Sequence, residues 1–206
     1  GFYNIIFGFP APIILALLLN EVRQPWFRRI SQTIIFIPFF LSWVVVSRLV
    51  YSILDIQSGA VNYVIKSLGG EPIFFMIKSN IFPMIVALAG IWRNSGFSCI
   101  IYLSALTSID PQLYEAARID GAGKFRQITN ITLPLLIPTM LVVLLLNIGQ
   151  FLNTGFNQID TLYNDLVRDT GEILINYIYN VGIKLGRFSF ATAAGVFQAL
   201  VGFILV

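Results

Sequence analysis

The segment DPQLYEAARIDGAGKFRQITNITLPLLIP, residues 110–138, is polar and helix-forming, and it lies between two long apolar runs. Its first two residues, Asp110 and Pro111, are typical of a helix start. An aspartate caps free N–H groups, and a proline at the first helical position lacks an N–H that would have no partner there. Residues 112–120 are mostly good helix formers, and Gly121 tolerates the left-handed backbone that ends many helices. The pattern predicts a short helix outside the hydrocarbon of a membrane.

The surface of this predicted helix suits contact with another protein. Ala116 and Ala117 would let a second backbone come close, as small residues do where two elements pack tightly. Glu115 adds a negative charge beside them. A second short helical piece is expected over 122–130, just before the next apolar run.

The rest of the chain is strongly apolar. Of its 206 residues, 57% are hydrophobic and 11% are charged, histidine is absent, and the mean hydropathy is +0.82. A typical soluble domain has about 25% charged residues, so the composition indicates a multi-pass membrane protein. The net charge of +3 is small and its basic residues are spread through the connections, which argues against nucleic acid as a partner.

Five apolar runs meet or approach the length of about 20 residues that a transmembrane helix needs. They are residues 2–19, 30–54, 81–106, 131–152 and 188–206. These runs predict an all-α integral membrane domain over residues 1–206. Because the sequence opens without a methionine and closes inside an apolar run, we expect the domain to be truncated at both ends.

Two of the apolar runs are interrupted, and two of the connections are expected to form helices. The third run contains polar residues at 92–96, where the helix could unwind around a polar cavity. The second run should be one span, although Pro38 and Arg48 interrupt it. Helices lying in the membrane interface are expected at 60–68 and 173–185. The arginine cluster at 23–29 weakly favours the cytoplasmic side for that connection and for the central polar loop.

Several classes of chemistry are excluded by the residues that are missing. Without histidine there is no Ser-His-Asp or Cys-His catalytic set and no zinc HExxH helix, and no GxxxxGK[ST] phosphate loop occurs. Every Asp and Glu falls in a connection, which disfavours a proton- or sodium-coupled carrier. We therefore predict no catalytic residue, no metal site and no ATPase site of its own. The single cysteine, Cys99, is expected to be a small buried hydrophobe.

The central segment also resembles a known motif. It reads Glu115-Ala116-Ala117, three residues, Gly121, nine residues, Ile131, one residue, Leu133-Pro134. This spacing is similar to the EAA loop of permease subunits in binding-protein-dependent ATP-binding-cassette importers. The flanks FGFPAPIILALLLNEVR (7–23), FLSWVVV (40–46), IYLSALTSIDPQLYEAARIDGAG (101–123) and FSFATAAGVFQALVG (188–202) resemble the sugar-importer permeases. Among these, they are most like the branch that handles complex or polysaccharide-derived oligosaccharides.

The resemblance implies a type I importer permease fold in a bacterial cytoplasmic membrane. Six spans are usual in this branch, so five of six would be present. The EAA coupling loop, 108–134, would be cytoplasmic, and its helix would dock on an ATPase dimer that binds ATP and Mg²⁺, so no cofactor is expected in this chain. A second permease subunit, an extracellular solute-binding protein and an oligosaccharide are the other implied partners, together with the lipid bilayer. Transport would proceed by alternating access.

The resemblance also assigns roles within the loop. Glu115 would make a charge contact with the ATPase, Ala116 and Ala117 would form the closely packed face, and Gly121 would supply the turn before the following span. Asp120 could contact the partner, cap the following helical piece or pair with Lys124.

The substrate path is inferred from polar residues within the apolar runs. A buried charge costs on the order of 3 kcal/mol, so Arg48 and Arg93, the latter beside Asn94, are functional candidates, although Arg48 could also snorkel to the outer surface. We hypothesise that one or both arginines face an anionic, uronate-containing sugar. A polar stripe is expected along the fourth span if its helix continues far enough, lining the path or joining helices. Its members are Asn147, Gln150, Thr154 and Asn157.

Three alternatives remain open. The same architecture could import a neutral sugar or another small solute. A membrane-embedded enzyme would need an acid, base or metal constellation that the sequence lacks. A structural scaffold would not need the EAA spacing, and changes at Glu115 or Gly121 would leave its function intact.

Overall fold

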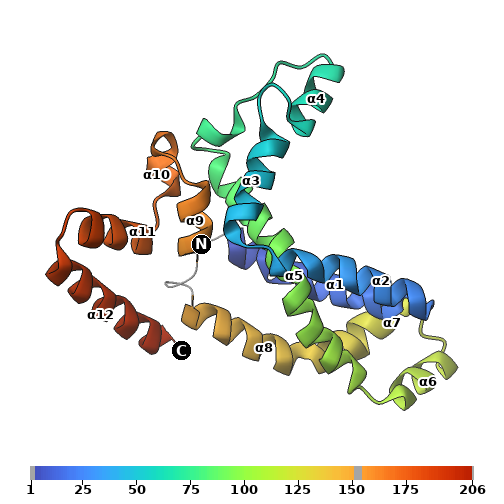
Figure 1. Cartoon of the computed structure of the whole chain (residues 1–206). Helices are drawn as coiled ribbons and strands as arrows, with labels where there is room; N and C mark the ends of the chain where they lie inside the picture. The colour runs from blue at the N-terminus through green and yellow to red at the C-terminus, as the bar shows by residue number, and fades with distance from the viewer. Residues whose placement is uncertain (1–2, 151–154, 206) are drawn as a thin grey trace.

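In the computed structural model, which describes residues 3–150 and 155–205, every regular element is a helix (Figure 1). The first half contains η1 (Asn4–Gly8), α1 (Pro10–Glu21), α2 (Pro25–Phe36), η2 (Ile37–Phe40), α3 (Trp43–Leu54), α4 (Ala60–Ser67), η3 (Phe75–Ile77) and α5 (Phe82–Thr107). The second half contains α6 (Pro111–Ile119), α7 (Lys124–Gln127), η4 (Ile128–Thr132), α8 (Leu133–Gln150), α9 (Phe156–Leu162), η5 (Asp165–Val167), α10 (Arg168–Gly171), α11 (Leu174–Tyr179), η6 (Asn180–Lys184) and α12 (Phe188–Leu205). The expectation of an all-α protein is confirmed.

The five predicted runs all form helices, but not all as straight spans. Two continuous helices, Phe82–Thr107 and Lys124–Ile148, are long and apolar enough to cross a membrane. The second run is instead a pair, Pro25–Phe40 and Trp43–Leu54, bent by 104° at its break, so the prediction of one regular span there is wrong. Shorter apolar helices at Ile6–Glu21 and Phe188–Ile204 account for the first and fifth runs.

The predicted unwinding of the third run is also wrong, because α5 is continuous through residues 92–96. This part of α5 packs closely on the end of α2. A Cβ added to Gly96 would overlap the carbonyl oxygen of Ile35. Gly96 therefore lies in a helix–helix contact, whereas Trp92 and Asn94 are exposed.

An inner core joins α1, α5 and α8 at the end that carries the α6 loop. Its buried side chains are Ile13, Ala16, Leu19, Cys99, Tyr102, Leu103, Leu106, Leu136 and Val143. The burial of Cys99 agrees with its prediction. At the same end, Lys124 Nζ lies 2.7 Å from Glu21 Oε2, so the link after α1 and the central loop lie on one side of the protein, as the sequence predicts for these two connections.

An outer core joins α3, α5 and α9 at the opposite end of α5. Its buried side chains are Val46, Met76, Phe82, Ile85, Val86, Ala89, Ile159, Leu162 and Val167. Two outer connections are fastened together beside it: Asn164 Nδ2 donates to Met76 O at 2.8 Å, and Thr170 Oγ1 donates to Ser79 O at 2.7 Å. The outer connections thus fold back on each other and on α5.

The helix predicted at 60–68 is present as α4, and Asn62 anchors it. The amide of this fully buried side chain donates to Asp55 O at 3.0 Å and Ile73 O at 2.9 Å, and its oxygen accepts from Ile73 N at 2.7 Å. A connection lacks the regular backbone hydrogen bonds of a helix or sheet, and side-chain hydrogen bonds of this kind take their place.

Asn62→Ala should loosen this outer connection. The change leaves buried backbone groups without partners, at a cost of about 2 kcal/mol, which corresponds to roughly thirtyfold faster local opening. Hydrogen exchange of peptides covering 55–81 would measure it. Asn80→Ala, which removes an exposed amide from the same connection, is the matched control. Equal exchange in the two variants would contradict the anchoring role.

Candidate functional site

The central loop forms the helix that its capping residues predict. Asp110 accepts a hydrogen bond from Gln112 N at 2.9 Å, and α6 begins at Pro111. The helix ends before Gly121, whose φ of 77° is left-handed, and Ala122 N donates back to Ala117 O at 2.8 Å. Both ends of α6 are therefore fixed by local sequence, and Figure 1 shows this helix projecting beyond the spans.

The exposed face of α6 is available to a partner. Glu115, Ala116, Asp120 and Gly121 are exposed, and Ala117 is half-buried. Two large apolar side chains of the loop are also exposed, since Ile119 on α6 is 87% exposed and Phe125 on α7 is 80% exposed. Sequence reasoning missed these two residues, although Ile119 follows Glu115 and Ala116 at helical spacing. We call these exposed residues the α6 face: Glu115, Ala116, Ile119, Asp120, Gly121 and Phe125.

Two contacts connect this loop to the spans. The hydroxyl groups of Tyr114 and Thr132 lie 3.0 Å apart and join α6 to η4, directly before α8. The ion pair of Lys124 with Glu21 reaches the end of α1. The expected pairing of Lys124 with Asp120 is therefore wrong, and so is the expected capping of the next piece by Asp120, because Gly123 precedes α7 without a side-chain cap.

Arg48 lies in a hollow of about 380 Å³ between α3 and α9. The lining residues are Val44, Ser47, Arg48, Tyr51 and Thr161. In the described part of the chain no acidic group pairs with Arg48, so its positive charge is unopposed within the hollow. The hollow is polar, cationic and open, which suits an anionic, hydroxyl-rich ligand.

Part of this hollow was visible in the sequence. Val44, Ser47, Arg48 and Tyr51 follow the three- and four-residue steps of one helical face. Thr161 carried no such signal, because it joins them only when α9 packs on α3. There Tyr51 Oη donates to Leu162 O at 3.0 Å, which fixes one wall of the hollow.

Arg93 is not in this hollow but beside the break between η2 and α3. Its Nε donates to Leu41 O at 2.9 Å and its Nη1 donates to Asn94 Oδ1 at 2.9 Å. The guanidinium carbon also lies 5.5 Å from the ring centre of Phe39 and 5.0 Å from that of Trp43. Arg93 thus interacts mainly with its own chain.

The polar stripe expected along the fourth span does not form as one helical face. Asn147 lies on α8 and bonds to Val143 O at 2.8 Å within that helix. Asn157 lies on a separate helix, α9, which begins after Gly155 at a φ of 101°. Thr154 lies outside the described residues, as does the side chain of Gln150. A role of these four residues in the path stays a prediction.

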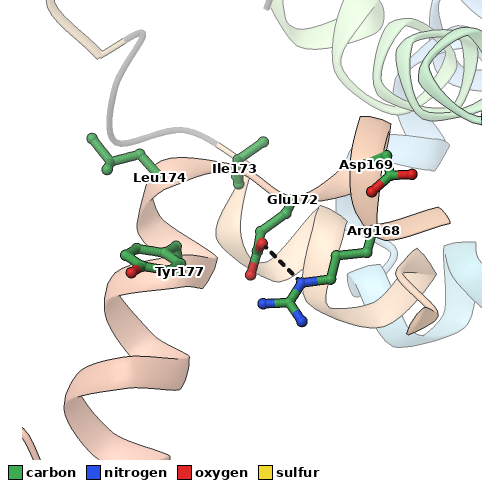
Figure 2. Close-up of a pocket in the computed structure, with 6 residues that line it drawn as sticks. All are labelled: Arg168, Asp169, Glu172, Ile173, Leu174 and Tyr177. Carbon is green, nitrogen blue, oxygen red and sulfur yellow. Dashed lines mark hydrogen bonds and ion pairs between the residues drawn. The ribbon is translucent and has the colours of Figure 1, made fainter. Parts of the chain in front are cut away.

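A second hollow, of about 390 Å³, opens on the outer side between α10 and α11 (Figure 2). Its lining residues are Arg168, Asp169, Glu172, Ile173, Leu174 and Tyr177. Arg168 Nε lies 3.4 Å from Glu172 Oε2, and this hydrogen bond together with the charge of Glu172 raises the pKa of the guanidinium. With two carboxylates and one paired arginine, this hollow suits an anionic ligand less well than the hollow at Arg48.

Comparison with known proteins gives a consistent family assignment. Residues 8–206 match the family model described as the binding-protein-dependent transport system inner membrane component. The polygalacturonan/rhamnogalacturonan transport system permease protein YteP of Bacillus subtilis is 48% identical over 203 residues, covering 98% of this chain and 63% of the relative. Protein LplB of the same organism is 42% identical and covers 98% of this chain and 64% of the relative. The chain therefore spans just under two thirds of the length of these relatives.

Solved structures agree with this assignment. A chain of a bacterial ABC transporter involved in the import of the acidic polysaccharide alginate matches with a TM-score of 0.94 and 40% identity, covering 98% of this chain and 71% of that one. A second structure of a bacterial alginate ABC transporter, in complex with an alginate pentasaccharide-bound periplasmic protein, matches with the same TM-score.

Proposed function

Because this chain belongs to the family of binding-protein-dependent transport system inner membrane components and has the type I permease fold, we propose that it is the permease subunit of an oligosaccharide importer. It forms half of a translocation pathway through a bacterial cytoplasmic membrane and works by alternating access. It is a transport subunit and not an enzyme, because ATP and Mg²⁺ bind to a separate ATPase dimer. A second permease subunit and an extracellular solute-binding protein complete the importer.

The α6 face supports the coupling part of this proposal. It presents Glu115, Ala116 and Ile119 on α6, which projects from the spans, and Phe125 on the following helix, α7. Exposed apolar groups beside a charge are typical of a protein interface, where their burial supplies most of the binding energy. We assign this face, together with Ala117, to the ATPase.

The substrate is an acidic, uronate-containing oligosaccharide, and the observation that carries this proposal is the unopposed charge of Arg48 in its hollow. A guanidinium can donate two parallel hydrogen bonds to a carboxylate. The hydroxyl groups of Tyr51 and Thr161 donate to Leu162 O and Asn157 O, and their oxygens can still accept from a sugar hydroxyl. The substrates named for similar proteins support it, since polygalacturonan and alginate are acidic polysaccharides. Asn94, Asn147, Gln150, Thr154 and Asn157 are assigned to the wider path.

Arg48→Gln should lower uptake of an acidic oligosaccharide by about tenfold or more, because hydrogen bonds to a charged group contribute about 1.5–3 kcal/mol. Uptake would be measured in proteoliposomes that hold the complete importer. The comparison is an oligogalacturonate against its methyl ester of equal length, which removes the charges and keeps the sugar.

Uptake of the ester should hardly change in Arg48→Gln, and Arg48→Lys should retain much of the acidic uptake. Equal uptake of both sugars by all three proteins would show that Arg48 does not recognise the carboxylate, and it would favour the alternative, a neutral sugar as the substrate. Failure of the wild-type importer to take up either compound would contradict the proposed oligosaccharide transport.

A further inference from the structure

The chain is broken between η2 and α3, and inside a membrane such a break is stable only where other parts of the protein bind its free backbone groups. After η2, Leu41 and Ser42 are extended, with ψ of 135° and 153°, and the two halves of the pair diverge by 104°. A helix that stops leaves carbonyl oxygens without partners, and in lipid each costs several kcal/mol unless protein or water satisfies it. The break therefore needs a donor from elsewhere in the fold.

Arg93 supplies that donor from the middle of α5. Its Nε bonds to Leu41 O at 2.9 Å, at the end of η2. Phe39, before the break, and Trp43, after it, both place their rings within 5.5 Å of the guanidinium carbon. Cation–π contacts of this kind strengthen where water is excluded. One side chain thus contacts both halves of the broken span.

The neighbouring residues of α5 reinforce the same contact. Phe97, one turn after Arg93, stacks on Phe39 with ring centres 4.5 Å apart and planes 11° apart. Gly96 lies against the backbone of Ile35, so no side chain separates the helices there. Arg93, Gly96 and Phe97 form one face of α5, spaced three and four residues apart, that holds the segment 35–43.

We propose that Arg93 is a positioning residue, whose guanidinium fixes the angle between α2 and α3 and so sets the direction in which Arg48 faces. The hollow of Arg48 begins at Val44, only three residues after the carbonyl that Arg93 holds. The charge of Arg93 acts on the backbone of its own chain and not on the sugar. The expected effect of Arg93 on transport rests on the proposed function, whereas its effect on the angle between α2 and α3 does not.

Spin labels on either side of the bend test whether Arg93 fixes the angle between α2 and α3. In a background carrying Cys99→Ala, labels at Ile34→Cys on α2 and Ile53→Cys on α3 occupy exposed positions on either side of the break. Their distance distribution would be measured by pulsed electron paramagnetic resonance on the complete importer in nanodiscs. We expect one narrow peak in the parent, a shifted or broadened distribution in Arg93→Gln, and an intermediate one in Arg93→Lys.

Two variants keep the test decisive if Arg93→Gln folds poorly. Trp43→Leu retains the guanidinium and removes one ring, and it should broaden the distribution in the same direction. Arg48→Gln is the matched control, because it removes an arginine from α3 and should leave the distance unchanged. An unchanged distribution in both Arg93→Gln and Trp43→Leu would overturn the inference.

Uptake separates positioning from substrate contact. Arg93→Lys should reduce uptake of oligogalacturonate and of its methyl ester alike, roughly tenfold, because a changed angle between α2 and α3 moves the whole hollow and not Arg48 alone. A loss confined to the acidic sugar, with spin-label distances unchanged from the parent, would show that Arg93 contacts the carboxylate and would overturn the inference. If the wild-type importer takes up neither sugar, the proposed function fails, while the spin-label distances still decide the role of Arg93.

Discussion

Glu115→Lys should reduce the ATP hydrolysis that sugar-loaded binding protein stimulates by about thirtyfold, the effect of losing one interface residue worth about 2 kcal/mol. Glu115 is exposed on α6, one turn before the exposed Ile119, whose apolar side chain would exclude water once a partner docks. A reversed charge there is repelled by a group that Glu115 attracts, and it is desolvated without a partner. The measurement is ATPase activity of the reconstituted importer with and without sugar.

Glu71→Lys is the matched control for this reversal. Glu71 is also exposed, but it lies in the outer connection between α4 and η3, on the side away from the α6 loop. Stimulated hydrolysis should remain near the wild-type level in this variant. If Glu115→Lys retained full stimulation as well, the α6 face would not carry the coupling, and a scaffold role for the loop would be favoured.

Gly96→Val should have the largest effect on stability. A Cβ at this position overlaps the carbonyl oxygen of Ile35 and lies 3.0 Å from the Cα of Phe36, and these backbone atoms cannot turn aside as a flexible side chain would. Overpacking a tight contact costs about 1–3 kcal/mol or more, so we expect the midpoint of thermal unfolding to fall by about 10 °C.

Thermal unfolding of the purified subunit in detergent would measure this effect. Gly195→Val on α12 is the matched control, because in the described part of the chain no atom lies within 4 Å of a Cβ added there. Equal midpoints for the two variants would mean that α2 and α5 do not pack closely at Gly96.

Local signals in the sequence predicted the α6 loop well. Asp110, Pro111 and Gly121 act within one or two turns of the chain, so their effect does not depend on the rest of the fold. The observed helix, Pro111–Ile119, begins and ends within a residue of its prediction. The family motif added roles for these residues, which the mutants above would test.

Contacts between distant residues were beyond the reach of sequence reasoning. Lys124 pairs with Glu21 instead of the nearby Asp120, because folding brings the end of α1 beside α7. The bend after η2 depends on Arg93, which is 52 positions from Leu41. The hydrophobic pattern predicted the second apolar run, but it held no information about the bend within that run.

The separation of the inner and outer cores along α5 has a mechanical consequence. Residues 82–89 of this helix belong to the outer core, and residues 99–106 belong to the inner one. Side chains at one end can therefore repack without disturbing those at the other, while the continuous helix acts as a stiff shaft between them. Under the proposed alternating access, this separation would let the packing at one end of α5 change while the packing at the other end is kept.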